Sequence, residues 1–167
     1  MTAYQNAYLL WILPHSLITV SLATAMLPSA SRLAAAHDFA GVGAETTRTM
    51  RLANTFLLPA SLAFVILGFP ITHLLFGYGR GADSWFYIAL TLVAFGVGLV
   101  PYTIQYVYLR AYYALEDTRT VFWLQVAISG ANVVFAIALT AVDADPVTIA
   151  PRLAIAYSLS YLLGAWI

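Results

Sequence analysis

The sequence contains no cysteine and no lysine, and its 167 residues carry only seven basic and seven acidic side chains. The absence of cysteine excludes disulfides, thiolate nucleophiles and cysteine-ligated metal sites. A formal net charge of zero gives no electrostatic support for binding nucleic acid. Charged residues make up 8% and hydrophobic residues 62%, whereas a typical soluble domain is about 25% charged. We therefore expect a membrane protein with no nucleic-acid partner.

The few charges are clustered, and long uncharged stretches separate the clusters. These stretches cover residues 1–31, 52–79, 84–109, 120–142 and 153–167. Apolar segments of about 20 residues match the roughly 30 Å hydrocarbon core of a bilayer. The short alternating segments of a membrane β-barrel do not recur. The pattern predicts an all-α integral membrane protein, a polytopic bundle of about five transmembrane helices in one region. The expected helices cover residues 2–32, 44–76, 85–115, 118–142 and 147–167.

Both ends of the sequence lie inside apolar stretches. No basic segment precedes the first stretch and no small-residue cleavage site follows it, so it does not have the pattern of a signal peptide. The last uncharged stretch, residues 153–167, is shorter than the roughly 20 residues that a spanning helix needs. We therefore expect the sequence to be part of a longer membrane protein and incomplete at both ends.

Prolines and acidic residues predict where the helices bend and begin. Pro14 removes a backbone donor inside the first helix and should kink it. Glu45 favours a helix start near residue 44, since a carboxylate is stabilising at the positive end of the helix dipole. Pro59 and Pro70 should bend or break that second helix. The glycine-rich stretch 77–84 and residues 143–146 predict turns.

The connectors between the expected helices differ in their arginine content. The second connector holds one arginine and the fourth none, whereas the first and third together hold Arg32, Arg48, Arg51, Arg110 and Arg119. Because cytoplasmic loops carry an excess of basic residues, we predict that the first and third connectors face the cytoplasm. The same arginines could bind anionic lipid headgroups, at about 1 kcal/mol each. In the third connector, Glu116 and Asp117 would neutralise the two arginines, and Asp117 or Thr118 would cap the next helix.

Polar residues within the apolar stretches are the candidate substrate-pathway positions. Asn6 and His15 lie in the first helix, and His15 follows a proline whose kink would expose a carbonyl group. Gln125, Ser129 and Asn132 lie on one face of the fourth helix, at spacings of four and three residues. The alternative for each is a hydrogen bond that only joins two helices. A neighbouring Gly130 would allow close approach of another helix.

The remaining polar and aromatic residues predict no catalytic or metal site. The three histidines are far apart, with no cysteine or carboxylate at ligand spacing, so no metal site is expected. The glycine-rich stretch lacks the Lys-Ser/Thr of a P-loop. Gln105 stands alone in the third helix, where a structural role is expected. Trp85, Tyr87, Tyr102 and Trp123 partly fit an aromatic belt at the membrane interface.

Three motifs occur in a fixed order: LATAMLPSASRL at residues 22–33, LLFGYGR at 74–80 and YYALEDTRT at 112–120. Their sequences and spacing resemble the MurJ/MviN family of lipid II flippases, within the MOP exporter superfamily. The resemblance covers about residues 3–160 and corresponds to the middle of the second lobe of a two-lobe transporter. The pattern around Asn6 is similar to members from high-GC Gram-positive bacteria, a source that the lack of lysine also favours.

The resemblance implies a transporter and not an enzyme, located in the bacterial plasma (inner) membrane. Its implied activity is the movement of lipid II, the undecaprenyl-linked peptidoglycan precursor, from the inner to the outer leaflet by alternating access. The implied partners are lipid II or a related polyprenyl-linked substrate, membrane lipids, and a first lobe that holds much of the substrate-binding arginine set. Two alternatives are another MOP exporter, carrying a different polyprenyl-linked saccharide or a drug, and a noncatalytic membrane scaffold.

The sequence departs from the family pattern at two places. Many members carry an arginine and, three residues later, a glutamate in the first helix here, where this sequence has Leu9 and Ile12. Some members bind sodium through an asparagine on the fourth helix here and an aspartate one turn later. Asn132 matches the first position, but Ala136 replaces the acid. We therefore expect no cofactor and no sodium ion.

Overall fold

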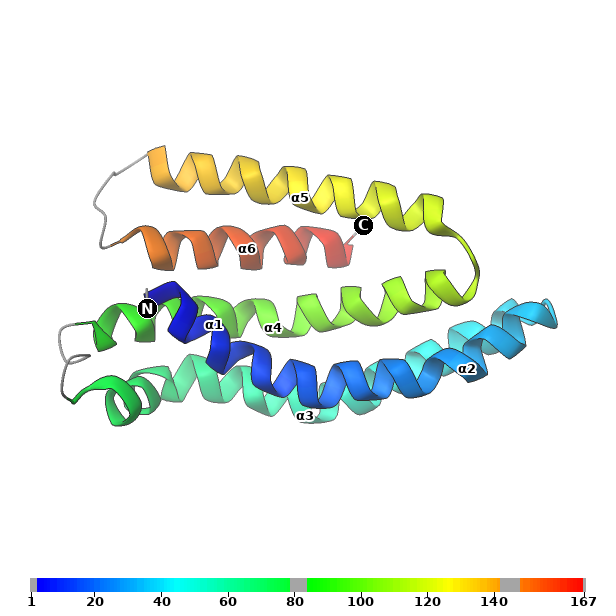
Figure 1. Ribbon diagram of the computed structural model, residues 1–167, viewed down its shortest axis with the longest axis horizontal. Helices are drawn as coiled ribbons and strands as arrows, with labels where there is room; N and C mark the ends of the chain where they lie inside the picture. The colour runs from blue at the N-terminus through cyan, green and yellow to red at the C-terminus, as the bar shows by residue number, and fades with distance from the viewer. Residues whose placement is uncertain (1–2, 79–83, 142–147, 167) are drawn as a thin grey trace.

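The computed structural model describes residues 3–78, 84–141 and 148–166 (Figure 1). Every described residue lies in a helix or a short turn, and none lies in a strand. The elements are α1 (Ala3–Pro14), the π-helical segment η1 (His15–Val20), α2 (Ser21–Ala35), α3 (Phe39–Phe76), α4 (Trp85–Ala114), α5 (Thr118–Ala141) and α6 (Ile149–Trp166). The turns predicted at 77–84 and 143–146 fall largely outside the described residues.

Four of the described helices are long and apolar enough to cross a membrane. They cover Ala3–Ala35, Phe39–Phe76, Trp85–Ala114 and Thr118–Ala141. The shorter α6 is the fifth helix of the bundle and lies between α4 and α5 (Figure 1). The all-α, multi-pass membrane prediction is therefore confirmed.

The first spanning helix contains the predicted irregularity at Pro14. The π-helical segment η1 starts at the next residue, and α1 runs at an angle to α2 (Figure 1). A proline has no N–H to donate, so the regular hydrogen-bond ladder is interrupted, and a π segment is one way to absorb that interruption. The segment buries His15 and Thr19 on the side where α1 buries Ala7 and Trp11. One continuous buried face results.

The connectors after α2 and α4 have the same construction. His37 and Glu116 each follow the last helical turn with a left-handed backbone, at φ 57° and 59°. The next residue donates its N–H back to the helix, Asp38 to the Leu33 carbonyl at 2.9 Å and Asp117 to the Tyr112 carbonyl at 3.1 Å. This is the Schellman arrangement that ends many helices.

The same two aspartates also start the following helices. The Asp38 carboxylate accepts from the Gly41 N–H at 2.8 Å, and the Asp117 carboxylate accepts from the Thr120 N–H at 3.1 Å. Asp117 is thus the N-cap of α5, so the first of the two predicted caps, Asp117 or Thr118, is confirmed. The predicted start of α3 near residue 44 is wrong, because Asp38 caps the helix and Glu45 lies inside it.

The predicted break in the second long helix does not occur either. α3 continues from Phe39 to Phe76 through Pro59 and Pro70. Both prolines lie on the exposed side of the helix. In a bilayer no water is available to satisfy the backbone groups that a break would release, so continuing the helix costs less.

Removing the cap at Asp117 should destabilise the protein in a pH-dependent way. Hydrogen bonds from the Thr120 hydroxyl and N–H hold the pKa of the Asp117 carboxyl below its ordinary value. A carboxyl whose pKa is lowered by folding stabilises the fold above its unfolded pKa, and this is lost as the pH falls through the folded pKa. Asp117→Ala should therefore lower the melting temperature in detergent by a few degrees at neutral pH, with the difference disappearing in acid.

Asp117→Asn is the matched control for that experiment. Asparagine is as good a helix cap as aspartate but carries no charge, so it should keep most of the stability and lose its pH dependence. Equal melting of the alanine variant and the wild type at neutral pH would contradict the role of this cap.

The central helix is α4, which packs against α3 on one side and α6 on the other (Figure 1). Two glycines make these approaches close. A Cβ on Gly96 would lie 3.1 Å from side-chain atoms of α3, and one on Gly98 would lie 3.0 Å from the Ser158 Cα on α6. Serine hydroxyls join the same surfaces, since Ser61 donates to the Gly96 carbonyl and Ser158 to the Ala94 carbonyl, each at 2.7 Å. Small residues at helix contacts are typical of membrane bundles.

Candidate functional site

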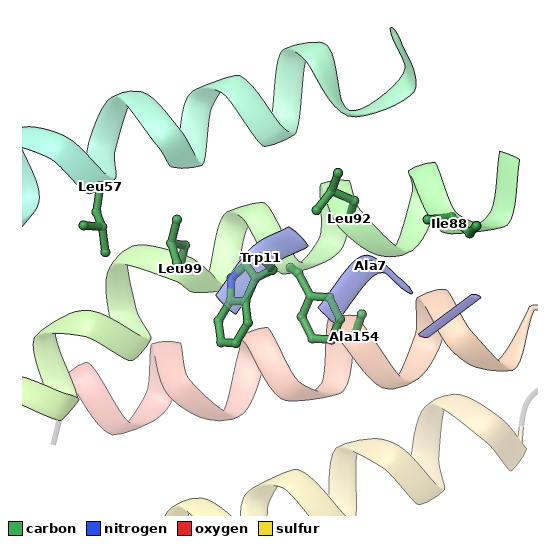
Figure 2. Packing of buried hydrophobic residues seen from close by; sticks show 8 residues of the cluster. Ala7, Trp11, Leu57, Ile88, Leu92, Leu99 and Ala154 are labelled. Atoms are coloured by element: carbon green, nitrogen blue, oxygen red, sulfur yellow. The ribbon is translucent and has the colours of Figure 1, made fainter. Parts of the chain in front are cut away.

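An aromatic cluster joins α1, α4 and α6. Trp11 is fully buried between α4 and α6 (Figure 2). Its ring centroid lies 5.3 Å from that of Phe95, 5.0 Å from Tyr102 and 5.7 Å from Tyr157. Tyr102 also contacts Tyr161 edge to face at 4.8 Å. The prediction that Tyr102 belongs to an interfacial belt is therefore wrong, because its ring is part of the protein interior.

His15 lies behind this cluster. The side chain is only 2% exposed, and its ring centroid lies 4.5 Å from that of Tyr102 and 5.0 Å from that of Tyr106. Its Nδ1 is 3.4 Å from the hydroxyl oxygen of Thr103. Because that hydroxyl donates its own hydrogen to the Leu99 carbonyl, the oxygen is left to accept from Nδ1–H. His15 therefore supports two tyrosines from behind.

A polar pocket of about 540 Å³ lies in front of these tyrosines, between α4, α5 and α6. The pocket lies beside the C-terminal half of α4, near the connector to α5. Its polar lining residues are Tyr102, Gln105, Tyr106, Arg110 and Tyr113 from α4, Gln125 from α5 and Tyr161 from α6. The α4 tyrosines and arginine recur every three or four residues, so they share one helix face. We refer to this space as the α4–α5–α6 pocket.

Arg110 bonds within its own helix and not to the neighbouring acids. Its Nη2 donates to the Tyr106 hydroxyl at 2.7 Å, and the guanidinium carbon lies 5.0 Å from the centroid of that ring. No carboxylate within the described part of the chain forms an ion pair with Arg110. The predicted neutralisation by Glu116 and Asp117 is therefore wrong for this residue, since Arg110 turns along α4 into the pocket wall.

Gln105 and Gln125 connect α4 to α5 across the pocket. The Gln105 amide donates to the Gln125 side-chain oxygen at 3.2 Å. Gln105 is 5% exposed, and its own Oε1 is buried without a partner among the described residues. This bond joins two helices, which is the structural role expected for Gln105 and the alternative given for Gln125.

The other predicted pathway residues do not join this pocket. Asn132 of α5 donates from Nδ2 to the Ser160 hydroxyl of α6 at 3.3 Å, farther along the bundle. Asn6 is half-buried in α1 and is not among the pocket's lining residues. Of the four candidates, Gln125 alone lines the pocket, with His15 behind its wall. The tyrosines and Gln105 were missed, although the four-residue spacing of Tyr102, Tyr106 and Arg110 could have indicated them.

The residues near Asn132 do not fit a sodium site. Hard cations take several oxygen ligands, usually including a carboxylate. Here the amide and hydroxyl of Asn132 and Ser160 bond to each other, and Ser160 donates onward to the Tyr157 carbonyl at 2.7 Å. The position one turn after Asn132 is Ala136, and α5 contains no aspartate or glutamate.

Four of the five candidate arginines are exposed, two of them close to the similar connectors and two inside α3. These are Arg32, Arg48, Arg51 and Arg119. Arg119 lies close enough to Asp117 to help lower the pKa of its carboxyl. Their roles in topology or in binding lipid headgroups remain predictions.

Known proteins resemble this chain in both sequence and fold. The family model described as lipid II flippase MurJ matches residues 1–167. A lipid II flippase MurJ from Burkholderia cenocepacia is 32% identical over 113 residues, covering 64% of this chain and 21% of that protein. A probable lipid II flippase MurJ from Rhizobium meliloti is 27% identical over 109 residues, covering 65% and 20%.

The fold comparison agrees with the sequence comparison. A solved structure of lipid II flippase MurJ in an inward closed conformation superposes with a TM-score of 0.82 at 22% identity. The match covers 98% of this chain and 34% of that one, so it shows a shared fold. The chain spans about a fifth of the length of the curated relatives named above: the matched region is 20% of the Rhizobium meliloti protein and 21% of the Burkholderia cenocepacia protein. Since the family model matches from the first residue to the last, the chain belongs to the MurJ family of lipid II flippases.

Proposed function

We propose that the chain is part of the second lobe of a flippase in the bacterial plasma membrane. The transported molecule would be lipid II, carried from the inner to the outer leaflet by alternating access between two lobes. The observation that carries this proposal is the match of the MurJ family model to all of residues 1–167. The activity is transport, and we propose no covalent step.

The arrangement of polar groups favours a transporter over a membrane scaffold. Exposed residues of α3 such as Phe56, Leu62 and Ile66 are apolar, as expected for contact with lipid tails. The pocket formed by α4, α5 and α6 instead gathers hydroxyl, amide and guanidinium groups, with Arg110 half-buried and Tyr113 and Gln125 exposed. Polar side chains in spanning helices usually face a cavity or a partner and mark a substrate or ion route. A purely structural lobe would not need such a pocket.

Transport would need more protein than this chain supplies. The positions where relatives carry an arginine and a glutamate in the first helix hold Leu9 and Ile12, and Leu9 is exposed. An anionic substrate would therefore be held partly by residues of the first lobe. We also propose that no sodium ion acts at Asn132, because Ala136 supplies no carboxylate.

Transport by the full-length protein that contains this segment is the test. Reconstituted into proteoliposomes with lipid II, it should expose lipid II to an externally added enzyme that cleaves the headgroup, with or without sodium. The 167-residue segment alone should expose none, because one lobe cannot alternate against itself. Flipping of an unrelated polyprenyl-linked saccharide but not of lipid II would support another exporter, and no flipping by the full-length protein would support a scaffold.

A further inference from the structure

We propose that the α4–α5–α6 pocket is a binding subsite for the phosphate-bearing head of a polyprenyl-linked lipid, with Arg110 as its anion-binding group. This inference rests on the proposed function. Gln125, held by Gln105, would bind the polar groups next to the phosphate, and Tyr106 would position Arg110.

Arg110 has unused capacity to bind an anion. A guanidinium group carries five N–H donors, and the bond to the neutral Tyr106 hydroxyl uses one of them. No carboxylate in the described part of the chain pairs with it. A partly buried cation at the edge of a membrane is costly unless an anion or water accompanies it. Since arginine forms paired hydrogen bonds with phosphate oxygens, a lipid phosphate is a fitting partner.

Contacts within α4 hold the Arg110 side chain in place. An arginine that only sets the orientation of the protein in the membrane would not need such contacts. Long basic side chains near helix ends usually extend toward water. Arg110 instead lies against Tyr106, one turn earlier in α4 and farther from the connector. The Tyr106 ring is in turn supported by the buried His15 ring, edge to face at 90°. Such support reduces the ordering cost of binding, which strengthens binding without adding contacts.

Gln105 and Gln125 supply the amide groups at the pocket wall. The Gln105 side chain is 5% exposed, and its Oε1 is enclosed on the α6 side, where a Cβ on Gly164 would lie 3.3 Å away. Because this oxygen is closed off from the pocket, Gln105 acts by holding the Gln125 side chain through its Nε2. The pocket's volume of about 540 Å³ is within the usual range for ligand sites.

The chemistry of the ligand follows from these groups together. One cation requires an anionic centre, the Gln125 amide suits a neighbouring hydroxyl or amide group, and tyrosine rings give flat surfaces for a sugar. A phosphate attached to an N-acetylated sugar has all three features. A phosphatidylglycerol head has the phosphate and hydroxyls but neither the amide nor the ring.

Binding to the purified full-length protein in detergent is the test, with three probes: lipid II, undecaprenyl pyrophosphate and phosphatidylglycerol. Arg110→Gln should weaken the Kd for lipid II and for undecaprenyl pyrophosphate by about tenfold, the loss expected for one charge-assisted contact. Arg110→Lys should lose less, since the charge remains. Arg152→Gln, which removes an arginine that donates to the Leu139 carbonyl far from the pocket, should change these Kd values less than about twofold.

A merely structural role for Arg110 gives different results. In that case Arg110→Gln would lower the melting temperature without lipid and leave the Kd for lipid II unchanged, which would overturn the proposal. If Arg110→Gln does not fold, Tyr106→Phe replaces it, since loss of the hydroxyl frees Arg110 and should weaken lipid II binding by about threefold. Unchanged binding by that variant would also overturn the proposal.

The probes separate this inference from the proposed function. Equal weakening for phosphatidylglycerol and lipid II would show a general phospholipid site and overturn the assignment to polyprenyl-linked lipids. A wild-type protein that does not bind lipid II would contradict the proposed function itself. A wild-type protein that binds lipid II, together with an equally tight Arg110→Gln variant, would contradict only this pocket.

Discussion

Replacing Gly98 by leucine is expected to prevent α6 from packing against α4. Even the first added atom, a Cβ, would overlap the Ser158 hydroxyl and lie 2.9 Å from the Ser158 Cβ and 3.0 Å from its Cα. The last of these atoms belongs to the α6 backbone, so a side-chain rotation cannot relieve the clash. Overfilling a packed contact usually costs about 1–3 kcal/mol, and a leucine at a helix crossing should be at or above the upper end. The Ser158–Ala94 hydrogen bond would be lost as well.

Unfolding of the full-length protein in a denaturing detergent measures this effect. Gly130→Leu is the matched control, because a Cβ at Gly130 would meet nothing within 4 Å. It should unfold like the wild type or slightly later, since leucine favours helix more than glycine does. The milder Gly98→Ala variant should be partly rescued by Ser158→Gly, which removes the atoms nearest the new methyl group. Equal unfolding of the Gly98→Leu and Gly130→Leu variants would refute the close contact between α4 and α6.

The same two glycines illustrate what the sequence could and could not predict. The spanning helices follow directly from local composition, because apolar length is a property of the residues in a row. Which glycine lies at a helix contact depends on the facing helix. The sequence-based prediction chose Gly130 for close approach, but that residue faces open space, whereas Gly98 meets Ser158, 60 residues later in the chain.

Helix boundaries failed for a related reason. Glu45 was a sound start signal on charge alone, yet Asp38 caps the helix because its carboxylate reaches the Gly41 N–H. The preceding residue, His37, adopts a left-handed backbone that sequence rules reserve mostly for glycine. Because residues 36–38 contain no glycine, nothing in them indicated a left-handed residue, and the connector between α2 and α3 was predicted to be longer than it is. Comparison with the Glu116–Asp117 pair, which has the same construction, would have indicated it.

The candidate site was predicted only in part. Intramembrane polarity drew attention to Gln125 and His15, and both lie in or behind the pocket. The grouping could not be predicted, because Gln105 and Gln125 meet through a helix-to-helix contact that no local pattern encodes. Arg110 was interpreted from its nearest charged neighbours in sequence, whereas its observed partner is an uncharged tyrosine one turn away.

Truncating Trp11 to alanine is the second change with a large expected effect. Trp11 is the largest of the fully buried side chains, and the centroids of four aromatic rings lie within 6 Å of its own. Lipid tails are as apolar as the protein interior, so the transfer of the indole out of water contributes little to assembly in a bilayer. The cost comes from the cavity and the lost dispersion contacts. We expect Trp11→Ala to lower the free energy of unfolding by about 3 kcal/mol, the low end of the range for truncating a buried large aromatic side chain to alanine.

Trp123→Ala provides a control that deletes the same atoms from a different environment. Trp123 is 61% exposed on α5, so its truncation should change the stability of the full-length protein in detergent by less than about 0.5 kcal/mol. The loss at Trp11 should also reach the pocket, since Trp11 contacts Tyr102, and Tyr102 contacts both His15 and Tyr161. Trp11→Ala should therefore weaken lipid II binding as well as stability, whereas Trp11→Phe should restore most of both. Equal stability losses at the two tryptophans would mean that α1 does not pack between α4 and α6, and the support behind Arg110 would then have no structural basis.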